Sequence, residues 1–165
     1  MATLVEQIQK FTHPSASNPL NIADQGADAS NFLKVSQMKW DPLQAERGTN
    51  LTAMPKGLMR SVMFGDPNKP GLSIFRMKYP SNYHVPPHYH WMAEHTTVIE
   101  GEFWMGLGDV VNESNLTKYS AGDYFTVGVG LAHYVVTRES SPIFELHVMG
   151  PWQMTYVNPT DHPQK

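Results

Sequence analysis

The segment His88-Tyr89-His90, preceded directly by Pro86-Pro87, is the feature that most constrains the fold of this chain. Proline fixes its own φ, lacks a backbone donor and pushes the preceding residue into an extended conformation, so a helix cannot run through this segment. In a β-strand, residues i and i+2 project from the same face. We therefore predict a strand that presents the imidazoles of His88 and His90 side by side.

A carboxylate and a third histidine follow in two segments that contain glycine. Glu94 begins a run rich in β-branched residues that ends at Gly101, and His133 closes a second segment that begins at Gly122. Together with the first two histidines they form a ligand set suited to a divalent transition metal with open coordination positions. The predicted ligands of this single metal ion are His88, His90, Glu94 and His133.

His95 is the one neighbour that competes with Glu94 for a place in this site. Strand alternation points it away from Glu94, whereas a β-bulge would exchange the two roles and give a site of histidines alone. The sequence leaves open which of the two completes the site. His84 and His147 are more consistent with a role outside the site than with one in it.

The rest of the chain has the pattern of short strands separated by turns. Residues 58–64 and 72–79 are strand candidates, and the segment between them, Asp66-Pro67-Asn68-Lys69-Pro70-Gly71, is a strong turn signal. Residues 102–109 are predicted to return from Gly101 as the second arm of a hairpin. Many short strands with Gly and Pro turns and little helix indicate an all-β jelly-roll barrel.

The two metal-ligand segments resemble the paired motifs of small single-domain cupins, the RmlC-like jelly rolls of the cupin superfamily. Three positions depart from the usual motifs: Asn82 replaces a leading glycine, Gly128 a proline and Thr137 an asparagine. The resemblance covers residues 82–137 and implies a double-stranded β-helix. The residues that match the motifs are His88, His90, Glu94, Gly101, Gly122, Gly130 and His133.

We predict three parts in the chain. Residues 1–31 form an N-terminal arm with a short helix, residues 32–157 form the cupin barrel, and residues 158–165 form a C-terminal tail. The arm is suited to covering a barrel edge or to exchange with a second copy, since exposed strand edges need protection. The predicted assembly is a homodimer.

Composition narrows the classes of partner. The chain has 165 residues, 12 Lys and Arg, 15 Asp and Glu, a net charge of −3 and no cysteine. The weak negative charge, without a basic stripe, argues against nucleic acid, and no apolar run approaches the ~20 residues that span a membrane. The absence of cysteine excludes a disulfide framework and a thiol nucleophile. The N-terminus lacks the pattern of a secretory signal, so we expect a cytoplasmic protein with a small-molecule substrate.

The ligand set and the resemblance together predict a metal-dependent enzyme with one divalent transition metal per chain. Fe(II) is favoured, and Zn, Ni, Mn and Co are alternatives. The leading hypothesis is a dioxygenase that acts on a small carbonyl or enol compound or on an aromatic compound. The alternatives are a metal-dependent isomerase or lyase and a non-catalytic cupin that binds a small ligand. The sequence does not identify a catalytic acid or base.

Overall fold

The computed structural model describes residues 33–43 and 54–163. The predicted N-terminal arm, residues 1–31, lies outside the described residues. Within them, helical structure is limited to three short 3-10 turns, η2 (Val35–Gln37), η3 (Glu113–Asn115) and η4 (Pro159–Asp161). No helix in this part of the chain is long and apolar enough to cross a membrane.

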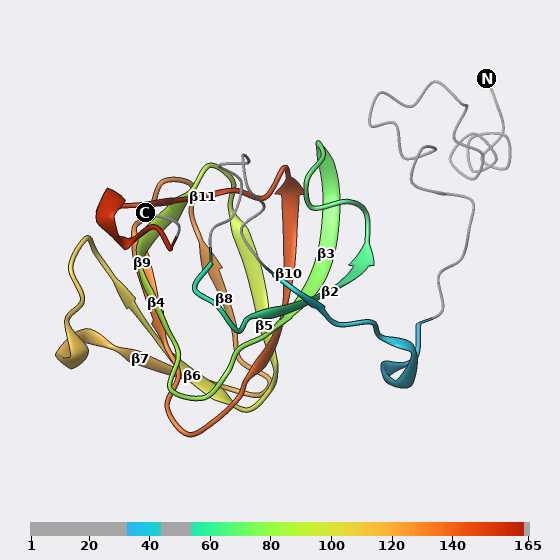
Figure 1. Ribbon diagram of the computed structural model, residues 1–165, viewed down its shortest axis with the longest axis horizontal. Helices are drawn as coiled ribbons and strands as arrows, with labels where there is room; N and C mark the ends of the chain where they lie inside the picture. The colour runs from blue at the N-terminus through green and yellow to red at the C-terminus, as the bar shows by residue number, and fades with distance from the viewer. Residues whose placement is uncertain (1–32, 44–53, 164–165) are drawn as a thin grey trace, which may run out of the picture. The chain divides into compact units, whose positions relative to one another are not determined.

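In the described part of the chain, two antiparallel sheets face each other (Figure 1). One sheet has six strands in the order β1-β2-β3-β10-β5-β8, and the other has five in the order β11-β4-β9-β6-β7. The prediction of an all-β barrel with little helix is confirmed. The strands are β1 (Asp41–Pro42), β2 (Met59–Phe64), β3 (Gly71–Lys78), β4 (His84–His90), β5 (Glu94–Glu100), β6 (Glu102–Leu107), β7 (Thr117–Ser120), β8 (Tyr124–Val127), β9 (His133–Val136), β10 (Ile143–Gly150) and β11 (Met154–Tyr156).

The predicted hairpin across Gly101 is wrong. β5 pairs with β10 and β8 in the six-stranded sheet, whereas β6 pairs with β9 and β7 in the five-stranded sheet. Gly101 has a φ of +75°, a left-handed conformation that favours glycine, and a Cβ at this position would meet Ser140 and Pro142. The chain therefore turns a corner at Gly101 and passes from one sheet to the other. A hairpin and a corner both place a glycine between two alternating segments, so the sequence pattern does not separate them.

The core lies between the two sheets. Buried side chains alternate with more exposed ones along β3 and β10, as expected for strands with one face against a core. Phe75 and Leu146 are buried on these strands, and Phe103 on β6 is buried on the facing sheet. The ring of Phe103 lies 5.1 Å from that of Phe144, so aromatic contacts join the two sheets across the core.

Tyr134 is fully buried on β9 and anchors the loop that follows β6. Its hydroxyl accepts a hydrogen bond from the backbone N–H of Asn112 and donates one to the Asn112 carbonyl, each at 2.9 Å. Gly106 stands opposite Tyr134 in the strand register, and its missing side chain leaves room for the ring. Because Tyr134 follows His133 directly, this packing also fixes the start of β9.

We predict that Gly106→Ala destabilises the protein by about 1–3 kcal/mol, because the added methyl group would overlap the Tyr134 ring. Urea unfolding followed by circular dichroism measures the change. Gly128→Ala is the control, since a Cβ there meets no atom within 4 Å and should leave stability nearly unchanged. Equal unfolding midpoints for the two variants would contradict this account of Tyr134.

Thr96 on β5 supplies a second test of the core. Its side chain is buried, and its hydroxyl has no hydrogen-bond partner among the described residues. Thr96→Val should therefore stabilise the protein by about 1 kcal/mol, since it removes an unpaired buried polar group. The control is Thr137→Val, because the Thr137 hydroxyl accepts from the Tyr83 N–H at 2.8 Å and donates to the Pro80 carbonyl at 2.6 Å. The control should unfold at a lower temperature than the wild type; a lower melting temperature for Thr96→Val as well would refute the prediction.

Candidate metal centre

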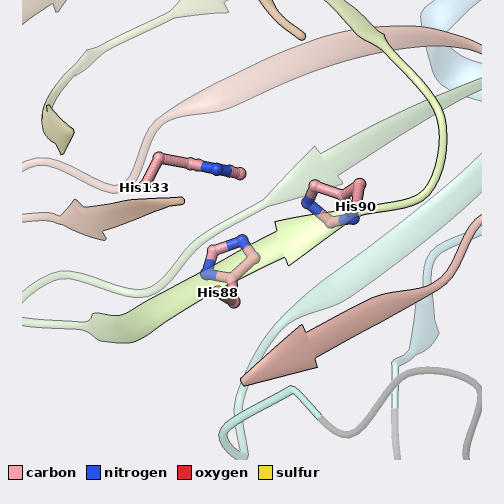
Figure 2. A group of neighbouring side chains, drawn as sticks. All are labelled: His88, His90 and His133. Atoms are coloured by element: carbon pink, nitrogen blue, oxygen red, sulfur yellow. The ribbon is translucent and has the colours of Figure 1, made fainter. Parts of the chain in front are cut away.

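Three histidines from two neighbouring strands converge inside the barrel. His88 and His90 project from β4, and His133 projects from the start of β9 (Figure 2). The two strands pair so that His88 stands opposite His133. One nitrogen from each ring lies within 4.8 Å of the other two, and all three side chains are buried. The structure thus brings together the three histidines that the sequence singles out.

An irregularity at Pro86-Pro87 sets the direction of the first two histidines. The register of β4 against β9 shifts between Val85 and His88. Proline has no N–H to donate to a neighbouring strand, so the ladder is interrupted at this point. Val85, His88 and His90 are all buried. In a regular strand, Val85 and His88 would point to opposite faces, because they are three positions apart. The shift therefore turns both histidines to the inside, where uninterrupted alternation from Val85 would place Tyr89.

Each of the three imidazoles is held by a backbone carbonyl. Nδ1 of His88 lies 2.8 Å from the Pro86 carbonyl oxygen, and Nδ1 of His133 lies 3.1 Å from that of Leu131. Nδ1 of His90 lies 2.7 Å from the carbonyl oxygen of Gln153. A carbonyl oxygen only accepts, so each Nδ1 carries a proton, and in the neutral form of each ring the lone pair lies on Nε2. This is the orientation and tautomer that metal-binding histidines adopt when their second nitrogen is fixed by a neighbour.

The surroundings of His88 and His133 favour the neutral form of their rings. Burial holds the pKa of His88 well below its ordinary value, and the neighbouring His133 and His90 lower it further. Burial also lowers the pKa of His133; the Glu94 carboxylate acts in the opposite direction and His90 in the same direction. Neutral imidazoles are the form that binds a metal ion. The site therefore offers neutral nitrogen ligands to a cation.

Glu94 lies in the same cavity, in contact with one of the three histidines. Its side chain is buried at the start of β5, and Oε1 lies 3.3 Å from Nε2 of His90. The same oxygen accepts a hydrogen bond from Nε1 of Trp152 at 2.5 Å. The set of ligand atoms that all lie within 4.8 Å of one another contains the three histidines and not this carboxylate.

The other histidines weighed from the sequence face away from the cavity. His95 is exposed, and its Nδ1 lies 2.8 Å from the hydroxyl of Tyr124 on the outer face of the six-stranded sheet. His147 is its cross-strand neighbour on β10 and lies 3.0 Å from Glu145, and His84 is exposed. Strand alternation predicts this outcome for His95, and no bulge exchanges it with Glu94.

The cavity beyond the histidines is mostly apolar. Its empty space measures about 370 Å³, a volume that includes open solvent at its mouth. Glu94 and Thr96 are polar groups of its wall. Its apolar and aromatic walls are formed by Met54, Met77, Tyr79, Phe103, Met105, Phe125, Val135, Phe144, Leu146 and Trp152.

Sequence reasoning missed the contribution of Trp152 and Gln153. From the sequence, Trp152 is a candidate for the wall of a pocket, for the core or for an interface, with the last two favoured, and Gln153 contributes only its backbone carbonyl. Trp152 and Glu94 lie far apart in the chain and meet only when the segment after β10 folds back over the site. No local pattern marks such a contact.

Comparison with known proteins agrees with the fold and the motifs. A family model described as Cupin matches residues 56–154. Germin-like protein 9-2 of Oryza sativa subsp. japonica is 26% identical over 141 residues, which cover 85% of this chain and 63% of that relative. Germin-like protein subfamily 2 member 5 of Arabidopsis thaliana is 34% identical over 76 residues, which cover 46% of this chain and 36% of that relative. The chain therefore spans less than two thirds of the length of either relative.

Solved structures show the same barrel at low sequence identity. An RmlC-like cupin from Shewanella frigidimarina is 18% identical with a TM-score of 0.53, covering 74% of this chain and 93% of that one. The polyketide cyclase RemF from Streptomyces resistomycificus is 16% identical with a TM-score of 0.60, covering 82% of this chain and 90% of that one. At this identity the likeness shows the fold alone. Because the family model matches more than half of the chain, this protein belongs to the cupin family.

Proposed function

We propose that this protein is a metal-dependent enzyme that binds one divalent transition-metal ion on His88, His90 and His133. The observation that carries the proposal is the hydrogen bond from each Nδ1 to a backbone carbonyl, which leaves three Nε2 lone pairs in one buried cluster. Histidines that only fill a core or lie on a surface are not required to carry their protons on the same ring nitrogen, whereas these three all carry a proton on Nδ1. Imidazole ligands suit Fe, Zn and Ni among the first-row metals, and Mn and Co are further alternatives.

The number of protein ligands favours chemistry over a purely structural metal. Structural sites are usually closed by four protein ligands, whereas catalytic sites keep a position open for water or substrate. Three histidines leave such positions, and they face the mostly apolar cavity described above. The apolar and aromatic walls exclude water and suit a compact apolar or aromatic compound.

Within this class we favour an Fe(II) dioxygenase that acts on a small carbonyl or enol compound or on an aromatic compound. A redox-active ion with open positions supplies the chemistry of oxygen activation. The protein contributes the orientation of the imidazoles, the dry walls and the carboxylate of Glu94. Structural similarity to a cyclase at 16% identity does not select the reaction, because one fold supports many chemistries.

Glu94 favours a second candidate, a metal-dependent isomerase or lyase. Its buried carboxylate lines the cavity and is not part of the three-histidine group. A carboxylate placed beside a Lewis-acid ion is suited to removing a proton next to a carbonyl group. In this candidate Zn, Mn, Ni or Co replaces Fe(II).

The metal content of the purified protein tests the proposed metal site. Protein prepared without chelator or histidine tag should contain near-stoichiometric metal, and His90→Ala should lose most of it while keeping its fold, since this ring is not part of the hydrophobic core cluster. Plasma mass spectrometry measures the metal, and circular dichroism checks the fold. His84→Ala on the same strand is the matched control, because His84 is exposed outside the cavity, and it should bind metal like the wild type. Equal metal in both variants would rule out the proposed site.

A comparison of the Fe(II) and Zn(II) forms separates the dioxygenase from the isomerase or lyase. The Fe(II) form should consume oxygen in the presence of pentane-2,4-dione or catechol, and the Zn(II) form should not, because zinc has no redox chemistry. An oxygen electrode measures the rate. If the Zn(II) form instead catalyses hydrogen–deuterium exchange beside the carbonyl of the dione, and Glu94→Gln lowers that rate about 100-fold or more, the isomerase or lyase candidate replaces the dioxygenase.

A further inference from the structure

We propose that the hydroxyl of Thr96 is a specificity-determining group that donates a hydrogen bond to an oxygen atom of the ligand in the cavity. The ligand class that follows is a compact, mostly apolar compound with two oxygen functions, one at the metal ion and one at Thr96. The inference rests on the metal site proposed above and deepens it, because it gives a recognition role to a residue outside the group of histidines.

Thr96 is a polar residue on the inner face of β5. Glu94, Thr96 and Val98 are buried on this strand and alternate with less buried residues. Thr96 is 1% exposed and lines the same cavity as the three histidines. Its Cα lies two positions, or roughly 7 Å, along the strand from that of Glu94, the residue in contact with His90. A small compound bound at the histidines can therefore reach Thr96 with its far end.

None of the protein groups that the structure describes pairs with this hydroxyl. Its Oγ1 is buried and has no hydrogen-bond partner among them. The cross-strand neighbours of Thr96 are Leu146 on β10 and Phe125 on β8, and side chains directly opposite in the register share one face of the sheet. Both are apolar and offer no acceptor. A buried hydroxyl without a partner destabilises the folded protein, so the packing of the barrel gives no reason for one at this position.

A ligand oxygen accounts for the hydroxyl better than a buried water molecule does. A buried water typically makes about three hydrogen bonds to polar groups of the protein. The neighbours of Thr96 on the inner face of the sheet are mainly apolar, so a water molecule there would be poorly satisfied. A cavity built to form a hydrogen bond with its ligand disfavours analogues that lack the matching group, which makes one hydroxyl in an apolar wall an effective means of selection.

The apolar part of the cavity wall is suited to a range of ligand shapes. Met54, Met77 and Met105 are three of its residues. Methionine is unbranched and has several rotatable side-chain bonds, so it adapts to irregular space. Because these side chains tolerate different shapes and form no strong hydrogen bonds, selection among ligands of similar size depends on the polar groups of the wall, Thr96 among them.

The experiment measures the binding of hydroxamates to the Zn(II) form by isothermal titration calorimetry. The hydroxamate group binds the zinc ion, and the tails form matched pairs in which an ether oxygen replaces a methylene group. The pairs are butano- and methoxyacetohydroxamate, pentano- and 3-methoxypropanohydroxamate, and hexano- and 4-methoxybutanohydroxamate. An ether oxygen only accepts hydrogen bonds, so it reports on a donor in the cavity wall.

The central variant is Thr96→Val, which removes the hydroxyl and keeps the branched shape of the side chain. Thr96→Ser, which keeps a hydroxyl, is the rescue variant. The matched control is Thr97→Val, because Thr97 is the next residue of β5 and alternation directs it to the outer face of the sheet. Thermal unfolding of the metal-free proteins is recorded alongside.

We expect Thr96→Val to weaken at least one ether probe by about 5–10-fold relative to its methylene partner, as the loss of one hydrogen bond requires. Thr96→Ser and Thr97→Val should keep the wild-type ratio. Because each ratio is taken within one protein, differences in zinc affinity between the two probes cancel when proteins are compared. Thr96→Val should also melt at a higher temperature than the wild type, which excludes general loss of structure as the cause.

Equal ratios in the wild type and Thr96→Val for every pair overturn the inference and leave the hydroxyl to a buried water molecule or to no partner. If Thr96→Val does not fold, Thr96→Ala provides the same comparison. A protein that takes up no Zn(II) contradicts the proposed metal site and the inference with it. Uptake of zinc without binding of any probe, or with ratios that do not depend on Thr96, contradicts the inference alone.

Discussion

The hydrogen bonds from three histidine Nδ1 atoms to backbone carbonyls are the interactions on which the site depends. Each bond fixes both the direction of a ring and the nitrogen that carries its proton. Two of the carbonyls, those of Pro86 and Leu131, lie two residues before the histidine they hold, so local backbone shape determines two of the three rings. The third ring, that of His90, is held by Gln153, which lies between the last two strands, β10 and β11. The site is complete only when the whole barrel is formed.

Around the site, the chain changes direction at residues whose backbone conformation is unusually restricted, as in proline, or unusually free, as in glycine. Pro86-Pro87 interrupts the ladder of β4 and reverses its alternation, which brings His88 and His90 inside. Gly101 lets the chain change sheets after β5. These features place Glu94 and His133 on strands of different sheets, with their side chains in the same cavity. A buried cluster of polar groups is tolerated there because each ring nitrogen that carries a proton has an acceptor.

Much of this arrangement follows from local sequence, and the remainder depends on contacts between distant segments. The HxH spacing predicted the shared face of His88 and His90, and alternation predicted the outward direction of His95. Two of the three departures from the usual cupin motifs also have local explanations: Asn82 adopts a φ of 52°, which asparagine tolerates better than most residues, and the hydroxyl of Thr137 makes the turn contacts at that position. The corner at Gly101 and the hydrogen bond from Trp152 were not predictable. Local sequence patterns do not show which strands pair in a sheet or which distant residue donates a hydrogen bond.

Nitrogen-15 NMR of the histidine side chains, recorded without metal and with bound Zn(II), measures which ring nitrogens carry protons and which bind the metal. We expect His88, His90 and His133 to carry their proton on Nδ1 in the metal-bound protein, and only their Nε2 signals to shift when zinc is added. The signals of His84, His95 and His147 should stay in place, since these side chains face away from the cavity. Protonated Nε2 atoms in the three clustered rings, or zinc-dependent shifts confined to the outer histidines, would contradict the account.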